Sequence, residues 1–442
     1  MICQYYKPEP FRISDICEEL VHRGHEVHVV TGYPNYPEGV LYEGYGKGKH
    51  IDEVINGVKI HRCYTVPRQT GIIKRFLNYY SYAIFSTKYV VFYGRRPIEE
   101  MPEFYAKADV KLHGIKARLF DRAGFGSRKA TEKFIEWVKK YDPDIIHLHN
   151  IHGYYIDVER LFKYLRTCGK KIIWTLHDCW SFTGHCVYFD YIVCDKWKNG
   201  CFNCPQKKEY PARIGPDMSR TNYIKKRQIF TGIPNMTLVT PSQWLSDLLR
   251  DSFMKEYDVT VIHNGVDTEI FRPMESKVKE RYACTDKRII LGVAAVWDKR
   301  KGLSSFIELS KKLDDTYRII LVGLTQEQIK SLPTNIIGIE HTNSVKELVE
   351  LYSAAEIFVN PTLEDNYPTT NIEAIACGIP VVTYDTGGSP ESAKMYGTCV
   401  PKRDVQALMR VIEDAGTLKP INVDVNYQTS VQKYMRLYER KI

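Results

Sequence analysis

The sequence lacks the features that define several large classes of protein. Its 442 residues contain no apolar run of the roughly 18–20 residues that a membrane-spanning helix needs. We expect no secretory leader, because the first residues turn polar at once. No G-x-G-x-x-G motif follows an early strand and no P-loop occurs, which argues against a nicotinamide dehydrogenase and a P-loop kinase.

Basic tracts with interleaved aromatic residues are also missing, so nucleic acid is not an expected partner. Charge is nevertheless uneven. Residues 1–265 carry 39 Lys and Arg against 29 Asp and Glu, a balance of +10, whereas the remainder has a balance of −1. A basic first part fits an anionic membrane surface or a lipid-pyrophosphate acceptor, and ordinary solvated charge explains it equally well.

Cysteine is more frequent than in most chains, with twelve residues, but it is scattered. Scattered cysteines indicate free thiols in a reducing compartment rather than a disulfide framework, so we expect a cytoplasmic protein. The composition, 44% hydrophobic and 26% charged, is that of an ordinary globular chain. A length of 442 residues predicts two domains.

Strand and helix patterns alternate along the chain, which predicts parallel α/β layers. A turn and linker at 263–273 separates two such series. We place domains at 1–265 and 274–415, followed by 416–442. Strands are expected at 26–31, 58–64, 144–149, 171–177, 236–240, 259–263, 288–295 and 318–322, and helices at 15–23, 131–140, 345–352 and 431–441.

The most informative stretch, residues 360–382, reads as a strand end, a polar loop, a short helix and a strand. The apolar run 357–359 predicts a buried strand, Pro368 followed by two threonines predicts a helix start, and Cys377 with the glycine after it predicts its end. Free N–H groups at a helix start attract phosphate oxygens. The carboxylates of Asp365 and Glu373 flank this start and suit sugar hydroxyls, so the sequence predicts a sugar–phosphate ligand.

These residues resemble the signature of the retaining glycosyltransferases of family 4, which have the GT-B fold. The resemblance implies an α/β protein with two facing Rossmann-like domains, a cleft between them, and a final helix that crosses back to the first domain. In this family two acidic residues eight apart bracket the loop. The first touches the donor sugar and the second touches the nucleotide ribose. Here Asp365 takes the first place, with Glu364 beside it as an alternative, and Glu373 takes the second.

The resemblance also assigns the diphosphate of the donor to a basic turn after the strand at 288–295. Lys301 is identified as the diphosphate-binding lysine, since a Lys-Gly pair that opens a helix brings an ammonium to a phosphate. The family often has an arginine where this chain has Ala295, and Arg300 is expected to compensate. A solvated basic turn is the plainer alternative. The residues expected to bind the donor at the helix start are Pro368, Thr369, Thr370 and Asn371.

Histidines end two neighbouring strands of the first domain. His177 is followed by Asp178, and the family's His-Asp pair at this strand end contacts the donor sugar. His147 and His149 are expected on the acceptor side, although a structural role is the commoner one for a histidine. The family mechanism is front-side attack without a catalytic metal, in which the leaving phosphate accepts the proton of the acceptor. The protein then supplies positioning and charge stabilisation.

One group of cysteines is not scattered. It has the spacing C-x7-C-x6-C-x2-C within an insertion at about 179–211. Four thiolates so close together suit a tetrahedral structural Zn²⁺, and four reduced thiols in a surface loop are the alternative. Catalytic zinc is not expected, because four cysteines leave no open position. The four are Cys186, Cys194, Cys201 and Cys204.

The start of the chain matches less uniformly. Residues 1–92 resemble one subgroup of the family, and residues from about 93 onward resemble the colanic-acid-biosynthesis type. The aromatic segment 72–92 carries Lys74, Arg75 and Lys88, so it either packs as a core helix or rests on a membrane surface.

We therefore expect a retaining glycosyltransferase in the cytoplasm or on the cytoplasmic face of the inner membrane. It would move a sugar from a UDP- or GDP-sugar to a lipid-linked or oligosaccharide acceptor in surface polysaccharide synthesis. Two alternatives remain: a sugar-nucleotide epimerase or phosphorylase of the same fold, and a non-catalytic nucleotide-sugar-binding protein.

Overall fold

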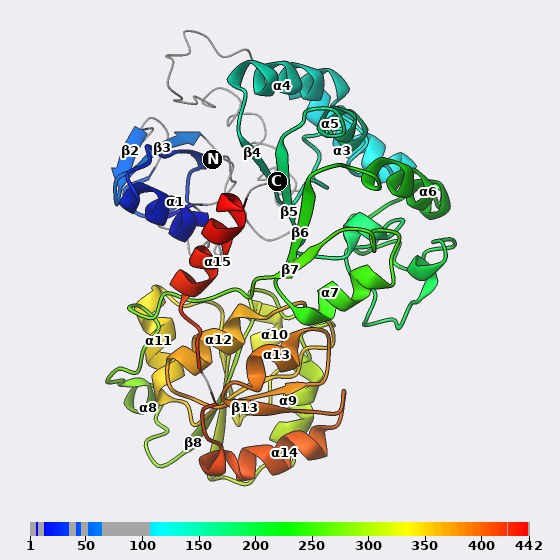
Figure 1. Ribbon diagram of the computed structural model, residues 1–442. Coiled ribbons are helices and arrows are strands. Elements are labelled where there is room, and N and C mark those ends of the chain that lie inside the picture. The colour runs from blue at the N-terminus through cyan, green and yellow to red at the C-terminus, as the bar shows by residue number, and fades with distance from the viewer. Residues whose placement is uncertain are drawn as a thin grey trace.

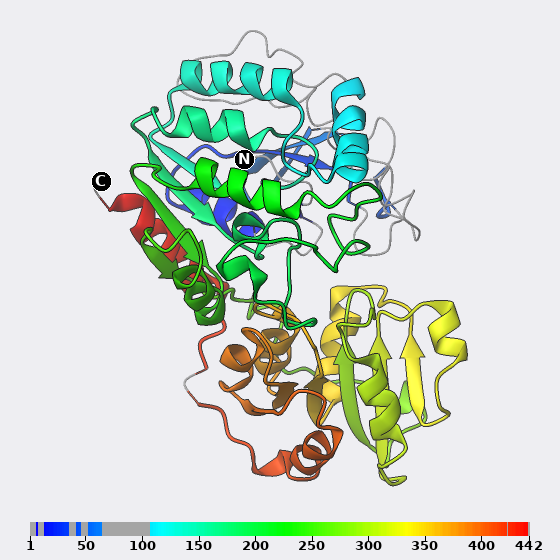
Figure 2. The ribbon, with the colours of Figure 1, turned by 90° about the vertical axis from the view of Figure 1, so that its right-hand side faces the viewer.

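The computed structural model describes residues 6–7, 13–34, 41–45, 52–63, 107–421 and 423–440. Within these ranges the chain forms two large α/β bodies and a small sheet beside the first (Figures 1 and 2). The small sheet and a four-stranded sheet come from the first half of the chain, and a six-stranded sheet comes from residues 288–400.

The small sheet has the order β1-β3-β2, with β3 parallel to β1 and antiparallel to β2. Val29 and Ile60 are fully buried in its core, together with Cys17 from the helix that precedes the sheet. The elements are α1 (Ile13–His22), β1 (His28–Gly32), β2 (Asp52–Ile55) and β3 (Val58–Cys63).

The four-stranded sheet is entirely parallel, in the order β4-β5-β6-β7. Three of its helices, α4, α5 and α6, pack side by side (Figure 2). Aromatic rings of Phe162, Trp174 and Phe230 meet in the core between sheet and helices. The elements are α3 (Lys107–Phe120), α4 (Arg128–Tyr141), β4 (Ile145–Leu148), α5 (Val158–Leu165), β5 (Lys171–Thr175), the short 3-10 helices η2 (Trp180–Phe182) and η3 (Lys196–Lys198), α6 (Ser219–Phe230), β6 (Met236–Thr240), α7 (Gln243–Arg250) and β7 (Val259–Val261).

The six-stranded sheet is also parallel, in the order β10-β9-β8-β11-β12-β13. Ile290 and Leu291 are neighbours on its central strand and belong to two different apolar cores, so both faces of the sheet are covered. The elements are α8 (Val278–Arg281), β8 (Arg288–Val293), α9 (Leu303–Ser310), β9 (Tyr317–Val322), α10 (Gln326–Lys330), β10 (Ile336–Ile339), α11 (Val345–Ala354), β11 (Ile357–Asn360), α12 (Thr369–Ala376), β12 (Val381–Tyr384), α13 (Ser389–Ala393), β13 (Gly397–Val400), α14 (Val405–Glu413), η4 (Ala415–Thr417) and α15 (Tyr427–Glu439).

The last helix, α15, leaves the second half of the chain and packs on the first (red in Figure 1). Leu437 is 3% exposed and lies in one apolar cluster with Ile173, Val239 and Ile262 of the four-stranded body. The helix begins four residues before the sequence predicts, because the side chain of Asn426 accepts a hydrogen bond from the N–H of Gln428 and caps it.

Two parts of the sequence prediction lie outside the described residues: the aromatic segment 72–92 and the change of subgroup near residue 93. No helix within the described residues is both long enough and apolar enough to cross a bilayer.

The packing of α15 gives a first prediction. Leu437→Ala should lower the free energy of unfolding by about 2–5 kcal/mol, because it removes a buried side chain and leaves a cavity. Urea unfolding followed by tryptophan fluorescence would measure the loss. Gln432→Ala, an exposed site on the same helix, should change stability by less than about 0.5 kcal/mol. Equal effects of both substitutions would contradict the docked position of α15.

Candidate active site

The two halves of the chain meet at the carboxyl ends of their central strands. The loop after β11, residues 361–368, faces the chain that leaves β5 and β6. The amide of Asn366 connects the halves: its Nδ2 donates to the backbone oxygen of His177 at 3.0 Å, and its Oδ1 accepts from the hydroxyl of Ser242 at 2.5 Å. Asn366 is 4% exposed, so these bonds are shielded from water. Ligands of parallel α/β folds bind at such strand ends.

Two glycines hold the backbone of this loop. Gly302 has φ +75°, and a Cβ there would lie 2.1 Å from the backbone oxygen of Pro361. Gly387 has φ +57°, and a Cβ there would lie 1.9 Å from the backbone oxygen of Asp365. Any other residue at these two positions would push the loop away, so the close approach of three backbone segments depends on them.

The basic turn and the acidic loop pair with each other. Lys301 Nζ lies 2.5 Å from Asp365 Oδ2. Arg300 binds Asp298 at 2.8 Å and reaches Glu364 Oε1 at 3.4 Å. The structure therefore brings together four of the residues that the sequence assigns to the site, Arg300, Lys301, Glu364 and Asp365. Ala295, where the family often has an arginine, is exposed.

Glu364 and Asp365 have different surroundings, although they are neighbours. Glu364 is 4% exposed, and burial raises the pKa of its carboxyl group. Its two oxygens accept from Arg300 and from the backbone N–H of Tyr191, at 3.4 and 2.8 Å. Asp365 is half-buried, and Oδ1 accepts from the N–H of Asn366 at 2.9 Å.

The helix start after the loop is as predicted, with Pro368 at the N-cap and Thr369 and Thr370 in the first turn. No side chain caps this end of α12. Glu373 lies one turn further on, where it accepts a hydrogen bond from the hydroxyl of Tyr352 at 3.1 Å.

The side chain of Asn371 has a structural role at this helix start. Its side chain is fully buried, accepts from Asn360 at 2.8 Å and donates to Ser392 at 3.0 Å. The amide thus faces the interior, where it joins β11, α12 and α13. Asn371 holds the helix start in place and does not present its side chain to a ligand.

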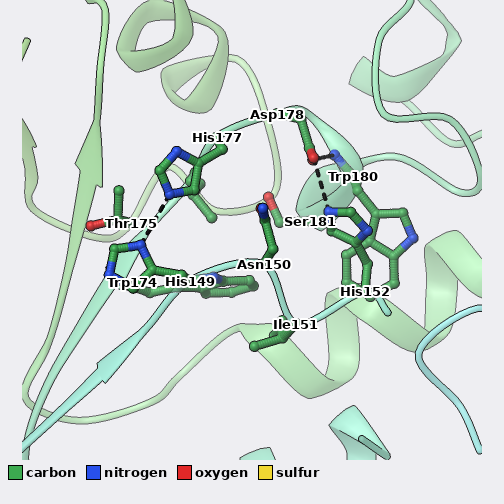
Figure 3. Close-up of a pocket in the computed structure, with 11 residues that line it drawn as sticks. His149, Asn150, Ile151, His152, Trp174, Thr175, His177, Asp178, Trp180 and Ser181 are labelled. Carbon is green, nitrogen blue, oxygen red and sulfur yellow. Dashed lines mark hydrogen bonds and ion pairs between the residues drawn. The ribbon is translucent and has the colours of Figure 1, made fainter. Parts of the chain in front are cut away.

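Histidines gather at the ends of β4 and β5 (Figure 3). His149 Nδ1 lies 3.0 Å from His177 Nε2, and burial lowers the pKa of both rings. His152, which the sequence analysis did not single out, binds Asp178 Oδ2 at 2.9 Å and lies against Trp180.

His147 lies between these residues and the last helix, and its ring packs against that of His149 with the centroids 4.3 Å apart. Its ring nitrogens lie 2.7 Å from the hydroxyl of Tyr438 and 2.8 Å from that of Thr175. The expected acceptor-side role of His147 stays a prediction, and its hydrogen bonds give it a structural role as well. These two hydrogen bonds connect β4 to β5 and to α15.

The cysteine-rich insertion folds mainly as a packed segment. Cys186 and Cys201 are buried in the same apolar core as Phe182, Phe189 and Trp197. Among the residues that the structure describes, no group of three or more His, Cys, Asp or Glu side chains is placed to hold a metal ion.

Three of the four thiols take part in hydrogen bonds. The Cys201 sulfur accepts from the N–H of Gly184 at 3.1 Å, and a hydrogen bond from Cys186 lowers the pKa of Cys204 to about 6. Structural zinc at the four cysteines stays a prediction of their spacing.

Comparison with known protein families agrees with this arrangement. The model described as "Glycosyltransferase Family 4" matches residues 87–270, and the model described as "Glycosyl transferases group 1" matches residues 287–415. Together the two matches cover both bodies of the structure. The chain belongs to glycosyltransferase family 4.

Curated members of the family are distant in sequence. A protein of Escherichia coli (strain K12), provisionally named as the colanic acid biosynthesis glycosyl transferase WcaC, is 25% identical over 71% of this chain and 76% of its own. The O-antigen chain mannosyltransferase RfbU of Salmonella typhimurium is 31% identical over 32% of this chain and 41% of its own. An N,N'-diacetylbacillosaminyl-diphospho-undecaprenol alpha-1,3-N-acetylgalactosaminyltransferase of Campylobacter jejuni is 25% identical over 45% of this chain and 58% of its own.

Solved structures show that this family 4 glycosyltransferase has the GT-B fold. Sucrose-phosphate synthase from Thermosynechococcus elongatus superposes with a TM-score of 0.57 at 16% identity, over 96% of this chain and 91% of its own. Anabaena HepE in complex with UDP and glucose superposes with a TM-score of 0.55 at 13% identity, over 100% of this chain and 98% of its own.

The partly buried ring of His147 gives a prediction of pH dependence. Burial lowers its pKa to about 3, below the unfolded value of about 6.5. The unfolded chain therefore binds a proton first, and the stability that neutral His147 contributes is lost as the pH falls from about 6.5 toward 3. Because the ring is partly exposed, we expect a loss of about 1–2 kcal/mol between pH 7 and 5.

A matched comparison isolates this residue. In His147→Asn the difference in unfolding free energy between pH 7 and 5 should be smaller than in the wild type by that amount. The contributions of the other histidines to this difference are present in both proteins and cancel in the comparison. Urea titrations at the two pH values provide the measurement. An identical pH dependence would show that His147 is already solvated in the folded protein.

Proposed function

We propose that this family 4 enzyme is a retaining glycosyltransferase that uses a nucleotide-diphosphate sugar. The observation that carries the proposal is the meeting of Lys301, Arg300, Glu364 and Asp365 beside the open N-terminus of α12. Two cations and free N–H groups suit a diphosphate, and the carboxylates suit sugar hydroxyls.

Each group has a definite task in this proposal. Lys301 and Arg300 neutralise the charge that develops on the leaving diphosphate. Glu364 and Asp365 orient the donor sugar, and Glu373 accepts from the ribose. His177, whose backbone oxygen is bound by Asn366, contributes from the opposite side of the cleft. The leaving phosphate accepts the proton of the acceptor hydroxyl, so the protein positions both substrates and supplies no nucleophile.

For the acceptor we propose a lipid-linked saccharide in surface polysaccharide synthesis, at the cytoplasmic face of the membrane. The names of the relatives support this assignment, since they include colanic acid, O-antigen and a diphospho-undecaprenol acceptor. The basic balance of residues 1–265 favours an anionic acceptor or lipid surface as well.

The relatives also bear on the two alternatives. They are named as glycosyl, mannosyl and N-acetylgalactosaminyl transferases, which favours transfer over epimerisation, phosphorolysis or simple binding.

Ligand-dependent stability tests the donor directly. The purified chain should gain about 2.7 kcal/mol in unfolding free energy at a hundred times the dissociation constant of its donor. Thermal unfolding against UDP-, GDP- and other nucleotide sugars would identify the base, with UDP-sugars as the first choice because HepE was solved with UDP-glucose. Absence of any shift across the panel would contradict the donor site.

Substitutions separate the roles of the two charged residues. Lys301→Ala should lower kcat/KM about 100- to 1000-fold, because it removes a cation from the leaving group, while the melting temperature changes little since Lys301 is about one-third exposed. Glu373→Gln should weaken donor binding about tenfold, the cost of a hydrogen bond to a charged group. Lys419→Ala, at an exposed lysine of the same half, is the control. Wild-type kinetics in both site variants would overturn the assignment.

A further inference from the structure

The insertion at 179–211 belongs to the first half of the chain, yet its tip reaches the second half. Tyr191 packs against an apolar core of the six-stranded body. Its backbone N–H donates to Glu364 Oε2 at 2.8 Å. The insertion therefore touches the carboxylate that we assign to the donor sugar.

Charged residues of the second half hold this tip. Lys402 Nζ lies 3.2 Å from both the backbone oxygen and the carboxylate of Asp190. The guanidinium of Arg403 lies over the ring of Tyr191, 5.7 Å from its centroid. Both basic residues belong to the turn between β13 and α14. This turn therefore contacts both Asp190 and Tyr191, the two residues that form the tip of the insertion.

The contact from Tyr191 matters because Glu364 is almost completely buried. At 4% exposure its carboxylate has little access to water, and Arg300 approaches only to 3.4 Å. A buried carboxylate needs close donors to keep its charge and its orientation. At 2.8 Å, the N–H of Tyr191 is the shorter of these two contacts.

We propose that Asp190 and Tyr191 form a positioning element of the donor site, which fixes Glu364 for a hydroxyl of the donor sugar. The inference rests on the proposed function. It assigns recognition of the nucleotide diphosphate to the second half alone and recognition of the sugar to both halves. Lys402 and Arg403 act through the tip and do not touch the substrate.

This division of roles has a measurable consequence. A free nucleoside diphosphate lacks the transferred sugar and so offers Glu364 no hydroxyl of that sugar, and a loosened tip should leave its binding unchanged. A nucleotide sugar should bind less tightly. The quantity to measure is therefore the ratio of the dissociation constants of the nucleotide sugar and the free diphosphate. A general loss of stability would weaken the binding of both and would leave this ratio unchanged.

A charge exchange between Asp190 and Lys402 tests the element. Asp190→Lys and Lys402→Asp alone should each weaken binding of the nucleotide sugar by about three- to fivefold, the upper range for a partly exposed ion pair, and leave binding of the diphosphate unchanged. The double exchange should restore the wild-type ratio. UDP-glucose and UDP are the probes, or the corresponding guanosine pair if the ligand panel selects it, and calorimetry gives both constants. Lys419→Asp is the control for an added negative charge.

A second pair of variants addresses the N–H itself. Tyr191→Ala removes the ring and keeps the donor, whereas Tyr191→Pro removes both, so the proline variant should show the larger loss of sugar affinity. Melting temperatures of all variants are recorded alongside. If the wild type binds both probes and every folded variant keeps its ratio, the positioning role is wrong while the proposed function stands. If the wild type binds no nucleotide or nucleotide sugar, the proposed function fails and this inference fails with it.

Discussion

The hydrogen bonds of Asn366 are the interaction on which the site depends. This one amide binds the backbone after β5 and the hydroxyl of Ser242 after β6, and so sets the distance between the two halves. The residues just before it, Glu364 and Asp365, carry the acidic groups of the site. Because the loop backbone is also held at Gly302 and Gly387, the carboxylates have little freedom to move. Pre-organisation of this kind is what charge stabilisation in an enzyme requires.

The charges at the site balance one another within the protein. Lys301 faces Asp365, and Arg300 faces Asp298 and Glu364. A diphosphate can replace a carboxylate as the partner of either cation at small net cost, because one charge-assisted contact is exchanged for another. The same pairing explains how two basic residues lie close together at this end of the sheet without destabilising it.

Part of this site could be predicted from the sequence, because it is encoded locally. The apolar run before residue 360, Pro368 and the Cys377 turn define β11, α12 and β12, and the structure confirms all three. Other features join distant residues. Tyr191 and Glu364 are 173 positions apart, and the donor is a backbone N–H, which every residue except proline has. The residue types in the sequence therefore do not predict such a contact.

Packing determines side-chain direction, which the sequence pattern does not predict. Asn371 lies in the predicted helix, but the contacts of α12 with α13 turn its amide inward. In the insertion, the cysteine spacing suggested a metal site, whereas the aromatic core around Trp197 determines where Cys186 and Cys201 lie.

The two sets of contacts between the halves differ in kind, and this difference determines how firmly each part of the interface is held. Around Leu437 the last helix is attached to the first half by apolar burial, which no small ligand replaces. At the carboxyl ends of the strands, polar contacts also join the halves: Asn366 with Ser242, Lys402 with Asp190, and Glu391 with the N–H groups of Gln243 and Trp244 at 2.7 Å. Exposed polar contacts exchange with water at a small net free energy, whereas the buried contact of Asn366 with Ser242 is costly to break. The geometry thus keeps α15 and the loop at Asn366 in place, and the partly exposed pair of Lys402 and Asp190 is the contact that rearranges at the lowest cost.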